Sequence, residues 1–192
     1  MKRLLLSIAL ATAAPLAIVA VPVVAQTLPP AVIVVVNMDE VFQNSAAGKT
    51  AQAELKTRLD GIQARLASLR TSFGAEEKAL GDTRPTAPGP AATAWEAKVR
   101  DFTTRKTQAE QELARRDQDF QASRQNVLKQ INEGAQPIVT AIMKERGASI
   151  ALAEGATLQH TASIDVTADV IARLDKALPR VSSATPTAPA AK

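Results

Sequence analysis

Apolar residues recur every three or four positions along two long stretches of the chain. From Leu55 to Phe73 they are spaced 4-3-4-3-4, and Leu80 continues the register. A second stripe of the same period runs from Trp95 to Val127, although Lys106, Arg116 and Ser123 interrupt it. A heptad spacing of this kind predicts helices that pack lengthwise on one another.

The segment between the two stripes, GDTRPTAPGPAATA at 81–94, holds three prolines and two glycines and breaks the helical pattern. It is either a domain boundary or the tip of a hairpin. The flanking stretches have similar lengths, roughly 65 and 80 Å at ~1.5 Å per residue. Matching lengths favour an antiparallel helical hairpin over residues 38–146, with Gly81 as the cap of its first helix.

A short apolar run precedes the first helix. AVIVVV at 31–36 shows no alternation, which predicts a strand covered on both faces. Asn37 follows as a predicted N-cap, and Glu40 completes the pattern of a capping box. Val36 and Val41 have the spacing of a hydrophobic staple.

The chain after the second helix predicts a small β body. Gly134 and Pro137 indicate a kink or restart, and Gly147 a helix C-cap. Residues 148–154 and 156–164 are expected to be two strands that form a hairpin around Gly155. In the second strand, alternation puts His160 on one face with Leu158, Ala162 and Ile164. Asp165 or Thr167 is expected to cap a last amphipathic helix within 147–178, and the low-complexity residues 179–192 are expected to be disordered.

The N-terminus has the pattern of a secretory signal. Lys2 and Arg3 precede an apolar run, and cleavage is expected near Ala25. An uncleaved membrane anchor is the alternative, because the run is nearly long enough to span a bilayer. The sequence therefore predicts a signal peptide at 1–25 and an exported protein. It has no cysteine, so packing alone must hold the fold.

These elements predict an α+β protein that is mainly α. Its first strand, within 26–37, is separated from the other two by the whole hairpin. A small open sheet leaves unpaired edges, so we expect the β body to be completed by oligomerisation. The residues expected at the oligomer interface are Ile33, Val35, Ile150, Leu152, Leu158 and Ile164.

Composition and charge narrow the function classes. The single histidine, the absence of cysteine, and the lack of a phosphate-binding loop or metal-ligand spacing argue against an enzyme, a cofactor or a metal site. The net charge is +4, or 21 basic against 19 acidic residues once Lys2 and Arg3 are removed. The basic excess lies in 56–116. It indicates either a solvated helix surface or attraction to acidic partners and peripherally to anionic lipid. Scarce aromatic residues and the export signal argue against nucleic acid.

The sequence also resembles a known family. IVVVNMDEVFQ at 33–43, RRDQDFQ at 115–121 on the returning helix, and DVTADVI at 165–171 resemble the Skp/OmpH family of periplasmic chaperones. The resemblance covers nearly the whole exported chain. It implies a homotrimer whose helical arms surround a cavity for unfolded outer-membrane proteins, which it would hold without ATP. The Pro/Ala-rich tip and the long C-terminal tail differ from the family pattern.

Two functions therefore stay open: a holdase chaperone, and a passive structural or adaptor protein that binds a fixed envelope partner. For the chaperone, the expected client contacts are basic and aromatic positions of the hairpin. For each aromatic residue, hairpin packing is favoured over client contact. The candidates are Lys56, Arg65, Arg70, Phe73, Trp95, Lys98, Phe102, Arg105, Lys106, Arg115 and Arg116.

Overall fold

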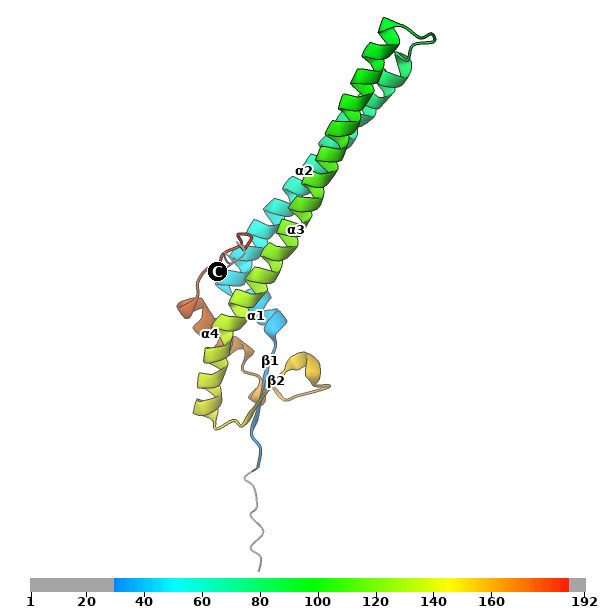
Figure 1. The fold of residues 1–192 in the computed structure, drawn as a ribbon. Coiled ribbons are helices and arrows are strands. Elements are labelled where there is room, and N and C mark those ends of the chain that lie inside the picture. The colour runs from blue at the N-terminus through cyan, green and yellow to red at the C-terminus, as the bar shows by residue number, and fades with distance from the viewer. Residues whose placement is uncertain (1–29, 187–192) are drawn as a thin grey trace, which may run out of the picture. The chain divides into compact units, whose positions relative to one another are not determined.

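The computed structural model describes residues 30–186, so the expected signal peptide at 1–25 lies outside the described part of the chain. Two long helices and a two-stranded sheet confirm the mainly α, α+β class (Figure 1). Among the described residues, no helix has the length and apolar character needed to cross a membrane. The elements in chain order are β1 (Ile33–Val36), α1 (Met38–Asn44), α2 (Ala46–Asp82), α3 (Pro90–Arg146), β2 (Ile150–Ala153) and α4 (Thr167–Ala177).

Helices α2 and α3 form the predicted antiparallel hairpin. Arg58 contacts Ser123 near its base and Arg65 contacts Glu112 further along, so residue numbers rise on one helix as they fall on the other. The connection is shorter than expected. Gly81 lies inside α2, Thr83 takes the C-cap position, and Pro90 is the first residue of α3. Proline suits that position because the amide there needs no intrahelical partner.

The first helical stretch is broken near its start, which the sequence pattern did not predict. Ser45 separates α1 from α2 with an extended backbone, and its hydroxyl accepts a hydrogen bond from the Gly48 amide at 3.1 Å. The amide of Ala46 donates to the Asp175 carboxylate of α4 at 2.7 Å. Two side chains therefore satisfy amides at the start of α2, and one of them is supplied by the distant last helix.

Asn37 is the predicted N-cap of α1 and accepts a hydrogen bond from the Glu40 amide at 2.9 Å. The reciprocal half of the capping box is wrong, since the Asn37 amide donates to the Thr167 hydroxyl at 2.9 Å and not to Glu40. Thr167 begins α4. The local motif is therefore replaced by a contact that ties the start of α1 to the start of α4.

One buried core lies where the sheet meets the helix ends. Its members come from β1, α1, the first part of α2, the last part of α3, and α4. Val34, Val35 and Val36 are all buried, which confirms that both faces of β1 are covered. We call residues 62–119 the arm, because this core does not reach them. In the arm only Leu69, Phe102 and Ala109 are buried.

The sheet differs from the expected one. β1 pairs with β2 in parallel, with Ile33 opposite Ile150 and Val36 opposite Ala153. The predicted strand at 156–164 is wrong. After β2 the chain makes 3-10 turns at Glu154–Ala156 and Ala162–Ile164, and only Asp165 bridges to Val35. Thr157 explains the turn, because its amide and hydroxyl both donate to the Glu154 carbonyl, at 2.9 and 2.8 Å.

Helix α3 continues through Gly134 and Pro137 without the predicted restart. Gly134 lies close against α4 and the residue after it: a β-carbon there would lie 2.8 Å from a methyl group of Leu178 and 3.3 Å from one of Leu174, so these leucine side chains would have to shift. Gly147 ends the helix in the left-handed conformation at φ 63°, as predicted.

The predicted disorder of the C-terminal tail is wrong for 179–186. Ser182 and Ala184 hydrogen-bond through their backbone to side chains of α3, and Ser183 is buried. Residues 187–192 lie outside the described part. A polar, proline-containing sequence carries no periodic apolar signal, so the tail's binding could not be seen from its composition.

We expect Gly48→Ala to destabilise the fold, because the new β-carbon would lie 1.7 Å from the Phe42 carbonyl oxygen. The backbone must shift to accept it, at a cost of about 1–3 kcal/mol in unfolding free energy. Gly61→Ala in the same helix is the control. Nothing lies within 4 Å of its β-carbon, so it should stabilise the protein by about 0.5–1 kcal/mol. Urea unfolding followed by circular dichroism measures both, and equal effects would contradict the packing at the Ser45 corner.

Candidate functional site

Of the eight predicted basic residues, five form ion pairs with carboxylates of the hairpin and three do not. Arg65 and Arg116 both bind Glu112, at 3.2 and 2.8 Å, and Arg105 binds Glu76 through two nitrogens, at 3.0 and 2.5 Å. Lys56 pairs with Asp60 at 2.7 Å, and Arg115 with Asp119 at 4.0 Å. Five of the eight predicted cations therefore have a carboxylate partner within the hairpin.

The ion pairs of the arm also lower the pKa values of the glutamates that take part in them. The Arg105 guanidinium lowers the pKa of Glu76 by hydrogen bonding, and Arg65 and then Arg116 lower that of Glu112. Both carboxylates therefore stay charged well below neutral pH. These pairs hold the register of the two arm helices where apolar burial is small.

Three predicted cations have no carboxylate partner among residues 30–186: Arg70, Lys98 and Lys106. Arg70 and Lys106 come together across the seam, where both line a groove of about 330 Å³ between α2 and α3. The walls include the apolar side chains of Leu66, Phe73 and Leu113. We call this the arm groove. It combines half-buried apolar side chains with charges of both signs, because Glu77 and Glu110 line it together with Arg70 and Lys106.

The predicted aromatic positions mainly hold the hairpin together. Phe73 and Phe102 meet edge to face with ring centres 5.7 Å apart, and Phe102 is buried. Near the tip, the Trp95 indole donates to the Leu80 carbonyl at 2.8 Å, and the Arg84 guanidinium lies over its ring. Of the three, Phe73 also reaches a groove surface.

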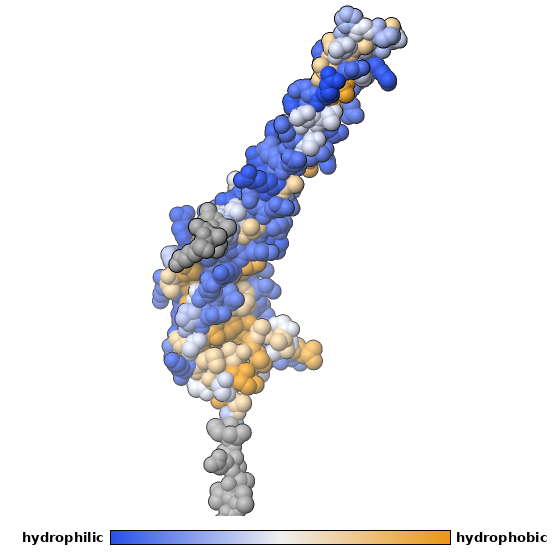
Figure 2. Space-filling view, in the orientation of Figure 1, coloured by the Kyte–Doolittle hydropathy of each residue, from blue (hydrophilic) through white to orange (hydrophobic). Residues whose placement is uncertain are grey.

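Apolar side chains gather on the surface of the β body, around β1, β2 and the loop after β2 (Figure 2). Of the predicted interface residues, Leu158 is fully exposed and Ile150 is 41% exposed. Val35 is different, because the single chain buries it to 1% exposure. A polar residue at Val35 would therefore disturb the chain's own core, and Ile150 and Leu158 are the positions that offer apolar surface to a partner.

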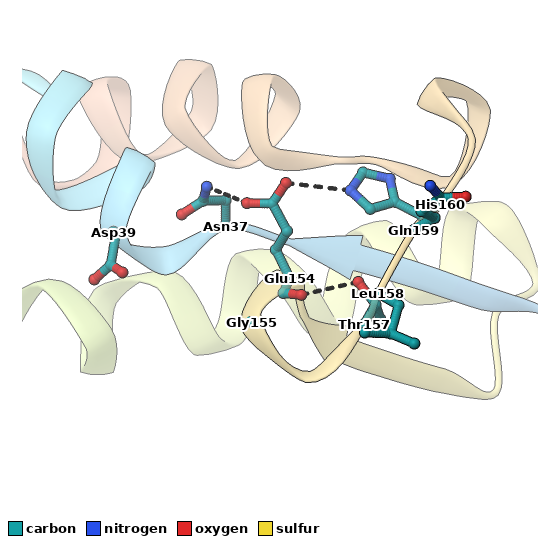
Figure 3. Close-up of a pocket in the computed structure, with 8 residues that line it drawn as sticks. All are labelled: Asn37, Asp39, Glu154, Gly155, Thr157, Leu158, Gln159 and His160. Atoms are coloured by element: carbon teal, nitrogen blue, oxygen red, sulfur yellow. Dashed lines mark hydrogen bonds and ion pairs between the residues drawn. The ribbon is translucent and has the colours of Figure 1, made fainter.

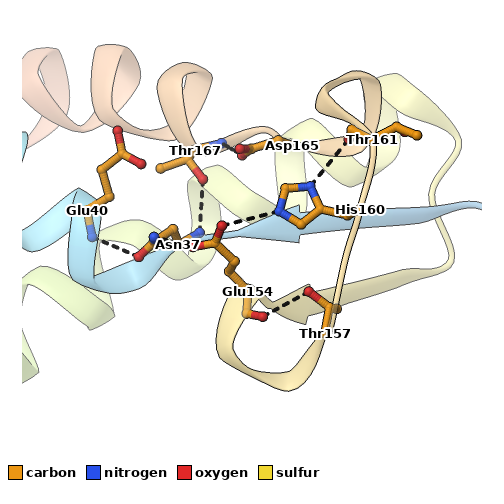
Figure 4. A network of polar contacts seen from close by, with 8 residues as sticks. All are labelled: Asn37, Glu40, Glu154, Thr157, His160, Thr161, Asp165 and Thr167. Carbon is orange, nitrogen blue, oxygen red and sulfur yellow. Dashed lines mark hydrogen bonds and ion pairs between the residues drawn. The ribbon is translucent and has the colours of Figure 1, made fainter.

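The loop after β2 also carries a polar network that sequence analysis missed. The Glu154 carboxylate lies between the Asn37 amide group and the His160 ring, in an open pocket of about 630 Å³ (Figure 3). Figure 4 shows how Asn37 extends the network to Glu40 and Thr167, and Asp165 accepts the Thr167 amide. The expected strand position of His160 hid this contact, since Glu154 becomes its neighbour only through the turn.

Both His160 ring nitrogens face acceptors. Nε2 lies 3.3 Å from Glu154 Oε1, and Nδ1 lies 3.3 Å from the Thr161 carbonyl. Glu154, and then Thr161, therefore raise the pKa of His160, because two acceptors favour the doubly protonated ring. In this arrangement neither nitrogen is left to act as a base. The histidine is better suited to holding the loop than to chemistry.

The Asp165 carboxylate has the opposite shift. Thr167 lowers the pKa of Asp165 through its side chain and its amide, and the nearby His160 adds to the effect. Within the described chain, no cluster of three or more histidine, cysteine, aspartate or glutamate residues could hold a metal ion.

Comparison with known proteins agrees with this geometry. The family described as "Outer membrane protein (OmpH-like)" matches residues 32–174, from the start of β1 into α4. The chain belongs to the OmpH-like family. This is the family that the sequence resemblance indicated. Membership supports a chaperone role in general and does not identify the client. No curated protein matches the chain.

A solved structure of a candidate outer membrane chaperone (OmpH-like) from Caulobacter crescentus has the same fold. It is 21% identical, with a TM-score of 0.68, and the match covers 82% of this chain and 93% of that one. At this identity the likeness shows the fold alone. The OmpH-like chain therefore shares both the hairpin and the small body with that protein.

We expect NMR titration of His160, the single histidine, to give a pKa above the ordinary ~6.5. Its stabilising contribution is then complete below pH ~6.5 and is lost as pH rises through the folded-state pKa. Glu154→Gln should move the pKa back toward the ordinary value. Asp39→Asn, in the same pocket but without a contact to His160, should change it less. An unshifted pKa in the unaltered chain would contradict the network.

Proposed function

We propose that the chain is an ATP-independent periplasmic holdase. It binds unfolded outer-membrane proteins between the helical arms of a homotrimer and prevents their aggregation. The observation that carries the proposal is the arm groove, an apolar surface between α2 and α3 with Arg70 and Lys106 beside it. Membership of the OmpH-like family supports the same role.

The arm suits a client that has no fixed structure. Unfolded barrel proteins expose apolar side chains and unpaired backbone groups along their whole length. Shallow grooves bind such chains through many weak contacts, and no single contact selects one conformation. Release then needs no nucleotide, because each contact is weak and the client's own folding competes with it.

The unpaired cations add an electrostatic attraction at short range. Arg70 and Lys106 lack carboxylate partners in the described residues, but Glu77 and Glu110 line the same groove, so the cations act on an acidic client only within the groove, inside the Debye length of ~8 Å at physiological salt. Lys56 is already paired with Asp60. The unpaired charges at the arm groove should therefore affect client binding more than the total charge of the hairpin does.

We expect the protein to suppress light scattering when a denatured outer-membrane barrel protein is diluted from urea, at a near-stoichiometric amount of trimer. Arg70→Glu with Lys106→Glu should weaken client binding roughly tenfold at low salt, and rising salt should remove the difference. Lys56→Glu is the matched control and should have little effect.

Two results would contradict this proposal. Unchanged scattering would favour the adaptor function, in which the hairpin binds a fixed partner. Suppression that depends neither on salt nor on the two groove cations would remove the arm groove from the mechanism.

We expect light scattering after gel filtration to give three times the chain mass for the unaltered protein. Leu158→Asp should give smaller species, because a charge would enter the apolar surface that the body presents to its partners. The unfolding midpoint of the separated chain should hardly change, since Leu158 is fully exposed. Leu59→Asp, on α2 outside the β body, is the control and should stay trimeric. A trimer that tolerates Leu158→Asp would place the interface elsewhere.

A further inference from the structure

The residues after α4 do not leave the molecule but return along the hairpin. Val181 packs against the buried core, and Ser182 to Thr185 then contact α2 and α3. In Figure 1 this last part of the described chain lies beside the lower half of the hairpin. We call residues 181–185 the strap.

Three of the six hydrogen bonds between the strap and the two helices are made to the strap backbone. The Gln130 side chain donates to the Ser182 carbonyl at 2.9 Å and accepts from the Ser182 amide at 3.0 Å. One helix turn away, the Asn126 side chain donates to the Ala184 carbonyl at 3.4 Å. Every residue except proline offers the amide and carbonyl that Gln130 binds. This recognition is therefore largely independent of sequence.

The spacing of these contacts fits a nearly extended chain, which bends at Ala184, where the amide donates to the Ser182 hydroxyl at 3.3 Å. Two residues of an extended chain advance about 6.6 Å, and four residues of a helix advance about 6.0 Å. The step from Ser182 to Ala184 therefore matches the step from Gln130 to Asn126. Thr185 continues the series at Ser123 and the Asp119 carbonyl, at 3.3 and 3.4 Å. The strap thus runs antiparallel to α3, toward the arm.

The intervening residue faces the other helix. The Ser183 hydroxyl hydrogen-bonds to the Glu54 carboxylate of α2, and Ser183 is only 7% exposed. Ser123 on α3 is fully buried and accepts a hydrogen bond from Arg58 of α2 at 3.0 Å. Ser183 therefore hydrogen-bonds to α2, whereas Ser182, Ala184 and Thr185 hydrogen-bond to α3. The enclosed position of Ser183 requires a small side chain.

We propose that this furrow between α2 and α3 is a binding site for an extended polypeptide segment with small side chains. The chain's own strap occupies the site in cis. Its ligand class is set by the Gln130 and Asn126 amide groups, which bind peptide backbone, and by the confined space at Ser183.

The site continues beyond the strap. Thr185 lines a cavity of about 340 Å³ together with Ile62, Phe120 and Arg116, in the direction of the arm. A longer extended segment could therefore pass from the furrow to the arm. If the proposed holdase function is correct, an unfolded client displaces the strap, and the strap limits client binding at the base of the hairpin.

Limited trypsin digestion at the bond after Arg180 tests whether the strap is bound, because a protease must pull the segment free to cut it. Gln130→Ala should speed this cleavage about tenfold, since it removes both backbone contacts to Ser182. Ser183→Glu should do the same by placing a second carboxylate against Glu54. Gln125→Ala, an exposed glutamine on the same helix, should cleave at the unaltered rate.

Circular dichroism melting checks that each variant is folded. Cleavage that is equally fast in the unaltered protein and in both furrow variants would overturn the proposal.

A second measurement tests the binding site without any client present. A labelled peptide of residues 180–186 should bind the full-length Ser183→Glu variant, whose own strap is displaced, and should bind the unaltered chain at least tenfold more weakly. Gln130→Ala added to Ser183→Glu should reduce that binding. No binding to Ser183→Glu would overturn the site whether or not the protein is a holdase.

Unfolded outer-membrane protein is then added to the unaltered chain in the trypsin assay. Faster cleavage after Arg180 supports competition between the client and the strap. Suppressed aggregation with an unchanged cleavage rate would overturn the competition, whereas the absence of suppression would overturn the proposed function alone.

Discussion

The parallel pairing of β1 with β2 is the constraint on which the rest of this structure depends. Ile33 pairs with Ile150, so the strands that lie side by side are separated by almost the entire hairpin. Parallel strands need a long crossover connection, and here α2 and α3 supply it. Because both ends of the hairpin are fixed at one small sheet, the two helices must leave it and return. The antiparallel seam follows from this geometry.

Burial then divides the hairpin into two parts with different roles. Near the sheet, α1, α4 and β1 cover the helix ends, and residues such as Val41, Ile131 and Leu174 are fully buried. In the arm, ion pairs such as Glu76 with Arg105 replace most of that packing. An element with few buried contacts opens locally at low cost. The arm can therefore open locally while the body stays folded.

Polar contacts between distant segments secure the body. Asn37 connects the start of α1 to the start of α4 through Thr167 and to the loop after β2 through Glu154. Asp175 returns from α4 to the start of α2. The strap adds a further layer on the outside of the two helices. These contacts all converge on the base of the hairpin, where the core is dense. They leave the arm groove and the apolar face around Ile150 and Leu158 uncovered within the described residues.

The sequence by itself determined the elements whose signals are local. The heptad stripes specified the two helices, the valine run specified a buried strand, and Gly147 ended α3, because periodicity and backbone preference act over a few residues. Tertiary structure decided the bend at Ser45 and the binding of the strap, which depend on groups far away in sequence, Asp175 and Gln130. The turn at the start of 156–164 is closed locally by Thr157 on the Glu154 carbonyl, and it interrupts the strand that alternation predicts. The same distinction applies to the site. The sequence identified the basic positions. Only the packing of α2 against α3 decided that Arg70 and Lys106 stay unpaired while Arg65 and Arg105 bind carboxylates. The reason is that an ion pair between two helices depends on their register.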